Sequence, residues 1–249
     1  MAAEKVFGEI KDNIVETESV QRYSFACQYC TGRDVLEIGC GARNRAKLLS
    51  GTAKNVFAVD NSFQALQFSR KKYPAGNVFF VACDAGQLPF KNNSFGAVVC
   101  LEVMEHVGKP EFLRGEAKRV LARSGIAVFS TPNKEIVSCS ETPLNPHHLK
   151  EFSLPEFMHF FSGHFSSAKF FGQSPKKSAV GKTPAMVSFV RREDFLGLRN
   201  LFPIPLRIML GRFFSRFTGA KNSCEINQGD FSISAPSKGS YCFICVCRK

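Results

Sequence analysis

The stretch that decides the fold is "RDVLEIGCGARNRAKLLSG", which runs from Arg33 to Gly51. It begins as a short apolar run typical of a buried strand, and this run is interrupted by Glu37. Two glycines, Gly39 and Gly41, then stand one residue apart. Because glycine lacks a Cβ, the pair predicts a tight turn where a ligand can approach the backbone at the end of the strand.

Strand-like and helix-like segments alternate along the chain beyond this turn. This alternation predicts an α/β fold of the Rossmann-like type, with a seven-stranded, mostly parallel sheet covered by helices on both faces. The last two strands lack a regular crossover helix, so we expect them to form an antiparallel edge hairpin. Besides the strand at 34–39, the predicted strands are 56–60, 78–84, 96–103, 125–132, 167–174 and 241–249, and the predicted helices are 63–73, 110–121 and 154–165.

Residues 175–240 break this rhythm, and they predict a basic, Phe-rich insert within a single domain that spans residues 1–249. In "LRIMLGRFFSRF" (206–217), an apolar stripe at helical spacing is flanked by Arg207, Arg212 and Arg216. Two interpretations remain open. Residues 195–217 form a helix that lies on a membrane surface, or they form a lid or subunit contact.

The net charge of +12 is concentrated in the last part of the chain. Residues 150–249 carry 15 Lys and Arg against 6 Asp and Glu, which favours an anionic partner such as a lipid surface, a nucleic acid or a charged substrate. The sequence shows no secretory signal and no apolar run of about 18 residues, and its ten cysteines are expected to be reduced. We therefore expect a cytoplasmic protein, with peripheral contact to the inner face of a membrane if residues 195–217 bind lipid.

The residues at the predicted strand ends indicate the cofactor. In an open parallel sheet, ligands bind beyond the carboxyl ends of the strands, and Asp60 there can accept both hydroxyls of a ribose. Glu37 would repel a pyrophosphate but suits an ammonium group, and the later glycine of dinucleotide sites is missing. Asp84 can accept from an adenine amino group, while the backbone of Ala85 contacts the ring edge. A ligand with an ammonium, a ribose and an adenine but no phosphate is S-adenosylmethionine.

Five segments, in order over about residues 33–133, carry a family resemblance: "VLEIGCG", "VFAVD", "DAGQLPF", "NNSFGAVVCLEVMEHV" and "RVLARSGIAVFSTPN". They resemble the class I S-adenosylmethionine-dependent methyltransferases. The resemblance implies an enzyme whose cofactor is contacted by Glu37, Gly39, Gly41, Asp60, Asn61, Asp84, Ala85, Leu101 and Glu102.

Two motifs predict the site that accepts the methyl group. In "LEVMEHV", Glu102, Glu105 and His106 point the same way if they share a helical turn. In "NPHHLKEF", His148 follows the fifth predicted strand and would lie above the same pocket. Glu102, Glu105, His106 and His148 could together hold Mg, Mn or Zn. Without a metal, Glu105 and the two imidazoles form an acid–base group, with His106 or His148 as the general base.

The E-x-x-E-H spacing with a later histidine resembles two groups, the ubiquinone-pathway O-methyltransferases and the small-RNA 3′-end 2′-O-methyltransferases. The segments "STPNKE", "NPHHLKEF", "KFFGQS" and "ICVCRK" resemble bacterial methyltransferases of glycan and cell-surface biosynthesis. We therefore expect O-methylation of a hydroxyl on a glycan, a lipid-linked intermediate or another small acceptor. Two alternatives remain open: an RNA 2′-O-methyltransferase with a metal-assisted site, and a cofactor-binding scaffold without turnover.

Overall fold

The computed structural model divides the chain into two units. One unit joins Ser19–Ser174 to Ser232–Lys249 and carries the candidate site, and the other comprises Met1–Glu18 and Pro175–Phe231. The structure describes residues 13–43, 45–138, 143, 145–176 and 230–249. Most of the predicted insert, including the segment 195–217 proposed for membrane contact, lies outside these residues. Within the described part of the chain, no helix is both long and apolar enough to cross a membrane.

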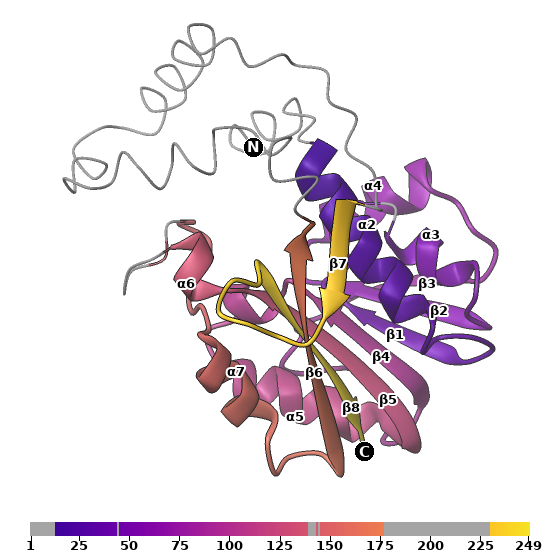
Figure 1. The fold of residues 1–249 in the computed structure, drawn as a ribbon. Coiled ribbons are helices and arrows are strands. Elements are labelled where there is room, and N and C mark those ends of the chain that lie inside the picture. The colour runs from indigo at the N-terminus through magenta and orange to yellow at the C-terminus, as the bar shows by residue number, and fades with distance from the viewer. Residues whose placement is uncertain (1–12, 44, 139–142, 144, 177–229) are drawn as a thin grey trace, which may run out of the picture. The chain divides into compact units, whose positions relative to one another are not determined.

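Eight strands form one sheet, in the order β3-β2-β1-β4-β5-β8-β6-β7 (Figure 1). Strands β1 to β5 run parallel to one another, whereas β8 is antiparallel to both β5 and β6. The bounds are β1 Asp34–Ile38, β2 Asn55–Asp60, β3 Val78–Ala82, β4 Phe95–Leu101, β5 Leu121–Pro132, β6 Ser167–Pro175, β7 Phe231–Ser234 and β8 Cys242–Arg248.

The predicted mostly parallel sheet with an antiparallel edge is confirmed, but the sheet has eight strands rather than seven. The additional strand is β7, a short edge strand that falls inside the predicted insert 175–240. Its four residues, "FSIS", sit in a polar stretch and are too few to produce a strong strand pattern.

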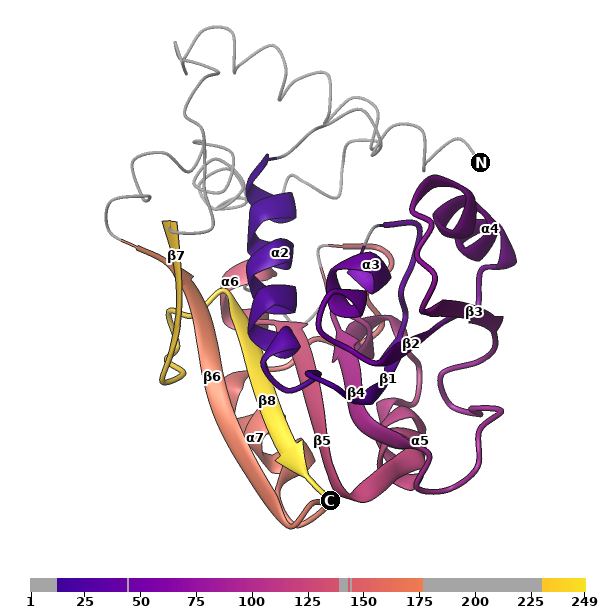
Figure 2. The same cartoon turned by 90° about the vertical axis from the view of Figure 1, so that its right-hand side faces the viewer.

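Helices cover both faces of the sheet, as the alternation predicted. Helices α2 and α3 lie against one face, and α5 and α7 lie against the other (Figure 2). The helices are α2 Asn13–Cys27, α3 Arg45–Ser50, α4 Phe63–Lys72, α5 Pro110–Val120, α6 Lys134–Val137 and α7 Leu154–Phe161, and a 3₁₀ turn, η1, spans Met104–His106.

Strand β1 contributes to both core layers because successive side chains of a strand face opposite sides of the sheet. Leu36 packs in the cluster that includes Phe157 of α7. Val35 belongs to the cluster that includes Tyr23 of α2 and Leu49 of α3. Full burial of one such side chain contributes about 1.5–3 kcal/mol to folding. The two clusters therefore fix the carboxyl end of β1, where the glycine turn begins.

The helices start at residues suited to helix N-termini, and these starts define the loops at the same edge of the sheet. The Ser62 hydroxyl accepts a hydrogen bond from the Ala65 N–H at 3.2 Å and caps α4. Pro110 occupies the first turn of α5, where its missing N–H costs nothing. At α7, Ser153 and Glu156 form a capping box.

Candidate active site

The glycine turn follows β1 and is closely packed on one side. Gly39 and Gly41 have φ values of +74° and +57°, in the left-handed region that favours glycine. The N–H groups of Gly39 and Cys40 both donate to the Val59 carbonyl, at 2.8 and 3.0 Å. A Cβ added to Gly39 would lie 2.4 Å from Cγ2 of Val103, whereas one added to Gly41 would meet no atom within 4 Å. Only glycine therefore fits at Gly39.

Asp60 ends β2 and braces this turn. Its Oδ2 accepts the Gly41 N–H at 2.8 Å, and its Oδ1 accepts the Ser62 N–H at 2.9 Å. Each carboxylate oxygen has more than one lone pair, so both can accept a further hydrogen bond from a ligand hydroxyl.

Asp84 lies just after β3, at the same edge of the sheet. Its Oδ1 accepts the Gly86 N–H at 2.6 Å, so the side chain shapes the loop that also contains Ala85. This arrangement leaves the second carboxylate oxygen of Asp84 without a hydrogen bond to this loop.

A cavity of about 360 Å³ lies at the carboxyl ends of β1 to β4. This volume falls in the usual range for small-molecule sites. The His106 side chain also contributes to its wall. The residues predicted to contact the cofactor that line the cavity are Gly39, Asp60, Asn61, Asp84, Ala85 and Glu102. Glu37, Gly41 and Leu101 were predicted as contacts too, but they are not among the lining residues.

Glu37 is fully buried in β1 beneath the glycine turn. The Tyr23 hydroxyl of α2 donates to its Oε1 at 2.7 Å, while its Oε2 has no hydrogen-bond partner among the described residues. Burial raises the pKa of Glu37 to about 7, although the Tyr23 hydrogen bond and the charge of Arg45 act in the opposite direction. The site therefore contains a carboxyl group whose charge is only partly compensated by the protein.

Glu102 lies directly after β4 in a left-handed conformation, with φ of +57°. The Ser130 hydroxyl donates to its Oε1 at 2.8 Å, and the Cys242 thiol contacts the same oxygen at 3.3 Å. The Arg22 guanidinium lies 3.8 Å from its Oε2. Glu102 is thus held toward α2 and the sheet, although it still borders the cavity.

The predicted helical turn that would align Glu102 with Glu105 and His106 is therefore wrong in one respect. The 3₁₀ turn begins at Met104, so only Glu105 and His106 belong to it. The left-handed backbone at Glu102 changes the chain direction before the turn starts.

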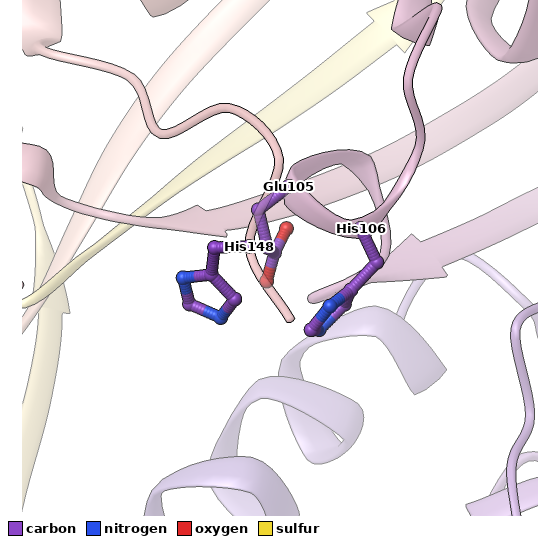
Figure 3. A group of neighbouring side chains, drawn as sticks. All are labelled: Glu105, His106 and His148. Carbon is purple, nitrogen blue, oxygen red and sulfur yellow. The ribbon is translucent and has the colours of Figure 1, made fainter. Parts of the chain in front are cut away.

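Glu105, His106 and His148 come together beside the cavity (Figure 3). Each offers one potential ligand atom, and these three atoms lie within 4.8 Å of one another. Glu102 does not belong to this group. Of the four residues predicted as metal ligands, the structure therefore brings three into one cluster, which we call the Glu105 cluster.

Hydrogen bonds outside the Glu105 cluster orient both imidazoles. His106 Nδ1 lies 2.9 Å from the His147 carbonyl oxygen, and His148 Nδ1 lies 2.7 Å from Oε1 of Glu151. In both rings this leaves Nε2 for a ligand. The cluster therefore has the outer hydrogen bonds that metal-binding histidines usually have.

Glu105 is the buried member of the cluster. Burial raises its pKa well above the usual value, and the nearby charge of Glu102 raises it further. A hydrogen bond from the Thr131 hydroxyl at 3.3 Å acts against this rise. A cation between Glu105 and the two imidazoles would favour the ionised carboxylate.

Several residues that complete the site were not predicted from the sequence. Tyr23, Arg22 and Cys242 reach it from segments far away in the chain, and no local pattern marks them. Glu151 is different, because its spacing of three residues from His148 is visible in "HLKE" and could have suggested the pair.

Comparison with known proteins identifies related sequences. The model of the methyltransferase domain family matches residues 36–129. A probable S-adenosylmethionine-dependent methyltransferase of Mycobacterium tuberculosis is 39% identical over 129 residues, which are 51% of this chain and 46% of that relative. A ubiquinone biosynthesis O-methyltransferase of Thiobacillus denitrificans is 30% identical over 110 residues, which are 43% of this chain and 47% of that relative. The chain thus spans about half the length of the relatives it matches.

The fold is also shared with solved structures. An S-adenosylmethionine-dependent methyltransferase of Thermotoga maritima superposes with a TM-score of 0.57 at 17% identity, and the match covers 94% of each chain. Residues 36–129 thus match the methyltransferase domain family, and the fold is the one found in S-adenosylmethionine-dependent methyltransferases.

Proposed function

We propose that this protein binds S-adenosylmethionine in the cavity and transfers its methyl group to an acceptor hydroxyl presented at the Glu105 cluster. One observation carries the proposal: a single cavity is lined both by the glycine turn with Asp60 and Asp84 and by His106 of the cluster. A cofactor and an acceptor bound at these two ends would meet inside the cavity.

The residues of the cavity fit this cofactor. Gly39 lines the cavity at a position where a Cβ would not fit. The Asp60 carboxylate retains lone pairs that can accept hydrogen bonds from ribose hydroxyls. Glu37 lies beneath the turn, outside the cavity wall. Its buried Oε2 has no partner among the described residues, and a carboxylate there suits a nearby ammonium group better than a phosphate.

When bound, S-adenosylmethionine supplies an electrophilic methyl group on a sulfonium centre. The protein must then align the acceptor oxygen with that methyl group and remove the hydroxyl proton. His106 and His148 each have one ring nitrogen occupied by a hydrogen bond, so the other nitrogen of each ring is left to accept a proton. Alignment alone can account for several orders of magnitude in rate.

We further propose that the Glu105 cluster holds a divalent transition metal. Two imidazoles and one carboxylate suit Zn²⁺ or Mn²⁺ better than Mg²⁺, which prefers oxygen ligands. The outer hydrogen bonds to the His147 carbonyl and to Glu151 support this assignment. A divalent cation there would supply Lewis acidity to an acceptor hydroxyl.

The related protein of Thiobacillus denitrificans is named as an O-methyltransferase of ubiquinone biosynthesis, which supports oxygen as the methylated atom. We propose a glycan, a lipid-linked intermediate or another small hydroxylated molecule as the acceptor.

Labelled S-adenosylmethionine tests the activity. Purified protein is incubated with extracts of the source cells, and mass spectrometry identifies the molecule that gains the label. We expect a methyl ether in one small-molecule or lipid fraction. Label in RNA would identify the alternative acceptor, and tight cofactor binding without any labelled product would instead support the scaffold alternative.

Chelation tests the metal separately. Transfer should be lost after chelator treatment and recovered with Zn²⁺ or Mn²⁺, while cofactor affinity stays unchanged. The Glu105→Gln variant should bind the cofactor but show no recovery. Full activity in chelator would contradict the metal and leave His106 or His148 as the general base.

A further inference from the structure

A buried hydrogen bond links His148 to a carboxylate outside the Glu105 cluster. His148 Nδ1 lies 2.7 Å from Oε1 of Glu151, and the Glu151 side chain is only 1% exposed. This length is typical of a charge-assisted hydrogen bond from an imidazole N–H to a carboxylate.

An ionised carboxylate can only accept hydrogen bonds. The proton of this contact must then lie on Nδ1 of His148. In the neutral imidazole, Nε2 is in that case the acceptor nitrogen. His106 is oriented in the same way, since the His147 carbonyl can also only accept and lies 2.9 Å from its Nδ1.

We propose that Glu151 is a positioning residue that holds His148 in the tautomer with the proton on Nδ1, so that Nε2 faces the Glu105 cluster as a permanent acceptor. This role rests on the proposed function, because an unprotonated Nε2 is what a divalent metal or a hydroxyl proton requires. Glu151 contacts neither of these itself and acts through His148.

The loop does not need Glu151 for its course. The N–H groups of Leu149 and Lys150 both donate to the Glu105 carbonyl, at 2.6 and 3.2 Å, and the His148 N–H donates to the Asn145 carbonyl at 3.0 Å. These backbone bonds already fix the loop against η1. The Glu151 carboxylate adds the side-chain contact that selects one ring nitrogen of His148.

Nuclear magnetic resonance of isotope-labelled imidazole nitrogens in the full chain tests the tautomer directly. The chain has five histidines, and a His148→Gln variant assigns the signal. At a pH where the ring is neutral, we expect the native His148 to carry its proton on Nδ1 alone. The Glu151→Ala variant should show the mixture of tautomers of an unconstrained imidazole. A native ring protonated on Nε2, or an Ala variant with an unchanged signal, would overturn the proposal.

Glu156→Ala serves as the matched control. Glu156 lies five residues away and caps α7 through Ser153, so its loss removes a local hydrogen bond without touching His148. Its His148 signal should match the native one. If Glu151→Ala does not fold, the native tautomer still decides the question. Glu151→Asp then replaces it, because its shorter side chain moves the carboxylate away from Nδ1 of His148.

Metal titration adds a second measurement. With metal-free protein and Zn²⁺ as the probe, Glu151→Ala should bind about 10- to 100-fold more weakly than native protein, and Glu156→Ala should bind equally. Native protein that binds no Zn²⁺ would contradict the proposed metal but not the tautomer, which is measured without metal, acceptor or cofactor. Equal Zn²⁺ affinity of the Glu151→Ala and native proteins would overturn the role of Glu151.

Discussion

The Tyr23 hydroxyl of α2 donates a hydrogen bond of 2.7 Å to the buried carboxyl group of Glu37 in β1. This contact joins the first described helix to the strand that leads into the glycine turn. Burial raises the pKa of Glu37 from 4.5 to about 7, and the opposing effects of Tyr23 and Arg45 do not restore the usual value. Between these two pH values, the native protein keeps a proton on Glu37 that the unfolded chain has already released.

The first prediction follows from that difference. Stability falls with rising pH where the native state binds more protons than the unfolded state, so the contribution of Glu37 is greatest below pH 4.5 and is lost as pH rises to about 7. The full change is about 3 kcal/mol. The Glu37→Gln variant should gain that amount relative to native protein between these limits, as measured by urea unfolding at several pH values. A constant difference between the two proteins across the window would contradict the raised pKa.

The second prediction compares the two glycines of the turn. Gly39→Ala places a methyl group 2.4 Å from Cγ2 of Val103 and forces alanine into a left-handed backbone. We expect a loss of about 2–4 kcal/mol in the free energy of unfolding. Gly41→Ala meets the same backbone strain but open space, so it should lose only about 1 kcal/mol. Adding Val103→Ala should restore part of the stability lost in Gly39→Ala but none of that lost in Gly41→Ala. Equal losses of stability at both glycines would argue against the contact with Val103.

The cofactor side of the site could be predicted from the sequence because its signals are local. Gly39 follows β1, Asp60 ends β2 and Asp84 comes two residues after β3, and parallel strands bring their carboxyl ends to one edge. The strands themselves are short apolar runs, which the sequence pattern makes visible. The same reasoning fails for Glu37, whose side chain lies beneath the turn rather than in the cavity wall.

The acceptor side depends on features that spacing does not show. The E-x-x-E-H pattern suggests that Glu102 faces the same way as Glu105, but the backbone at Glu102 is left-handed and the turn begins two residues later. The Ser130 hydroxyl, which holds Glu102 away from the cluster, comes from a strand 28 residues further along the chain. The spacing of residues within a motif cannot reveal a contact with a residue so far away in the sequence.

The third prediction tests the backbone at Glu102. Glycine adopts a φ of +57° without strain, whereas alanine does not. Both Glu102→Gly and Glu102→Ala remove the hydrogen bond from Ser130, so this loss cancels in their comparison. The glycine variant should be more stable than the alanine variant by about 1 kcal/mol, measured by urea unfolding. The opposite order would mean that residue 102 adopts an ordinary helical or extended conformation.

The last prediction concerns Asp60, which uses its two oxygens on the N–H groups of Gly41 and Ser62. In Asp60→Asn, the amide nitrogen replaces one acceptor and faces an N–H donor, and the charge that would bind the ribose hydroxyls is lost. Affinity for S-adenosylmethionine should fall by about 1–3 kcal/mol, the usual scale for a hydrogen bond to a charged group. Calorimetry measures this loss.

Asp34→Asn is the matched control, because Asp34 starts β1 at the opposite end of the strands and accepts a hydrogen bond from Asn55 at 2.8 Å. Its affinity should equal that of native protein. An unchanged affinity in Asp60→Asn would remove Asp60 from the binding site, and an equal loss in both variants would show that the charge acts only at long range.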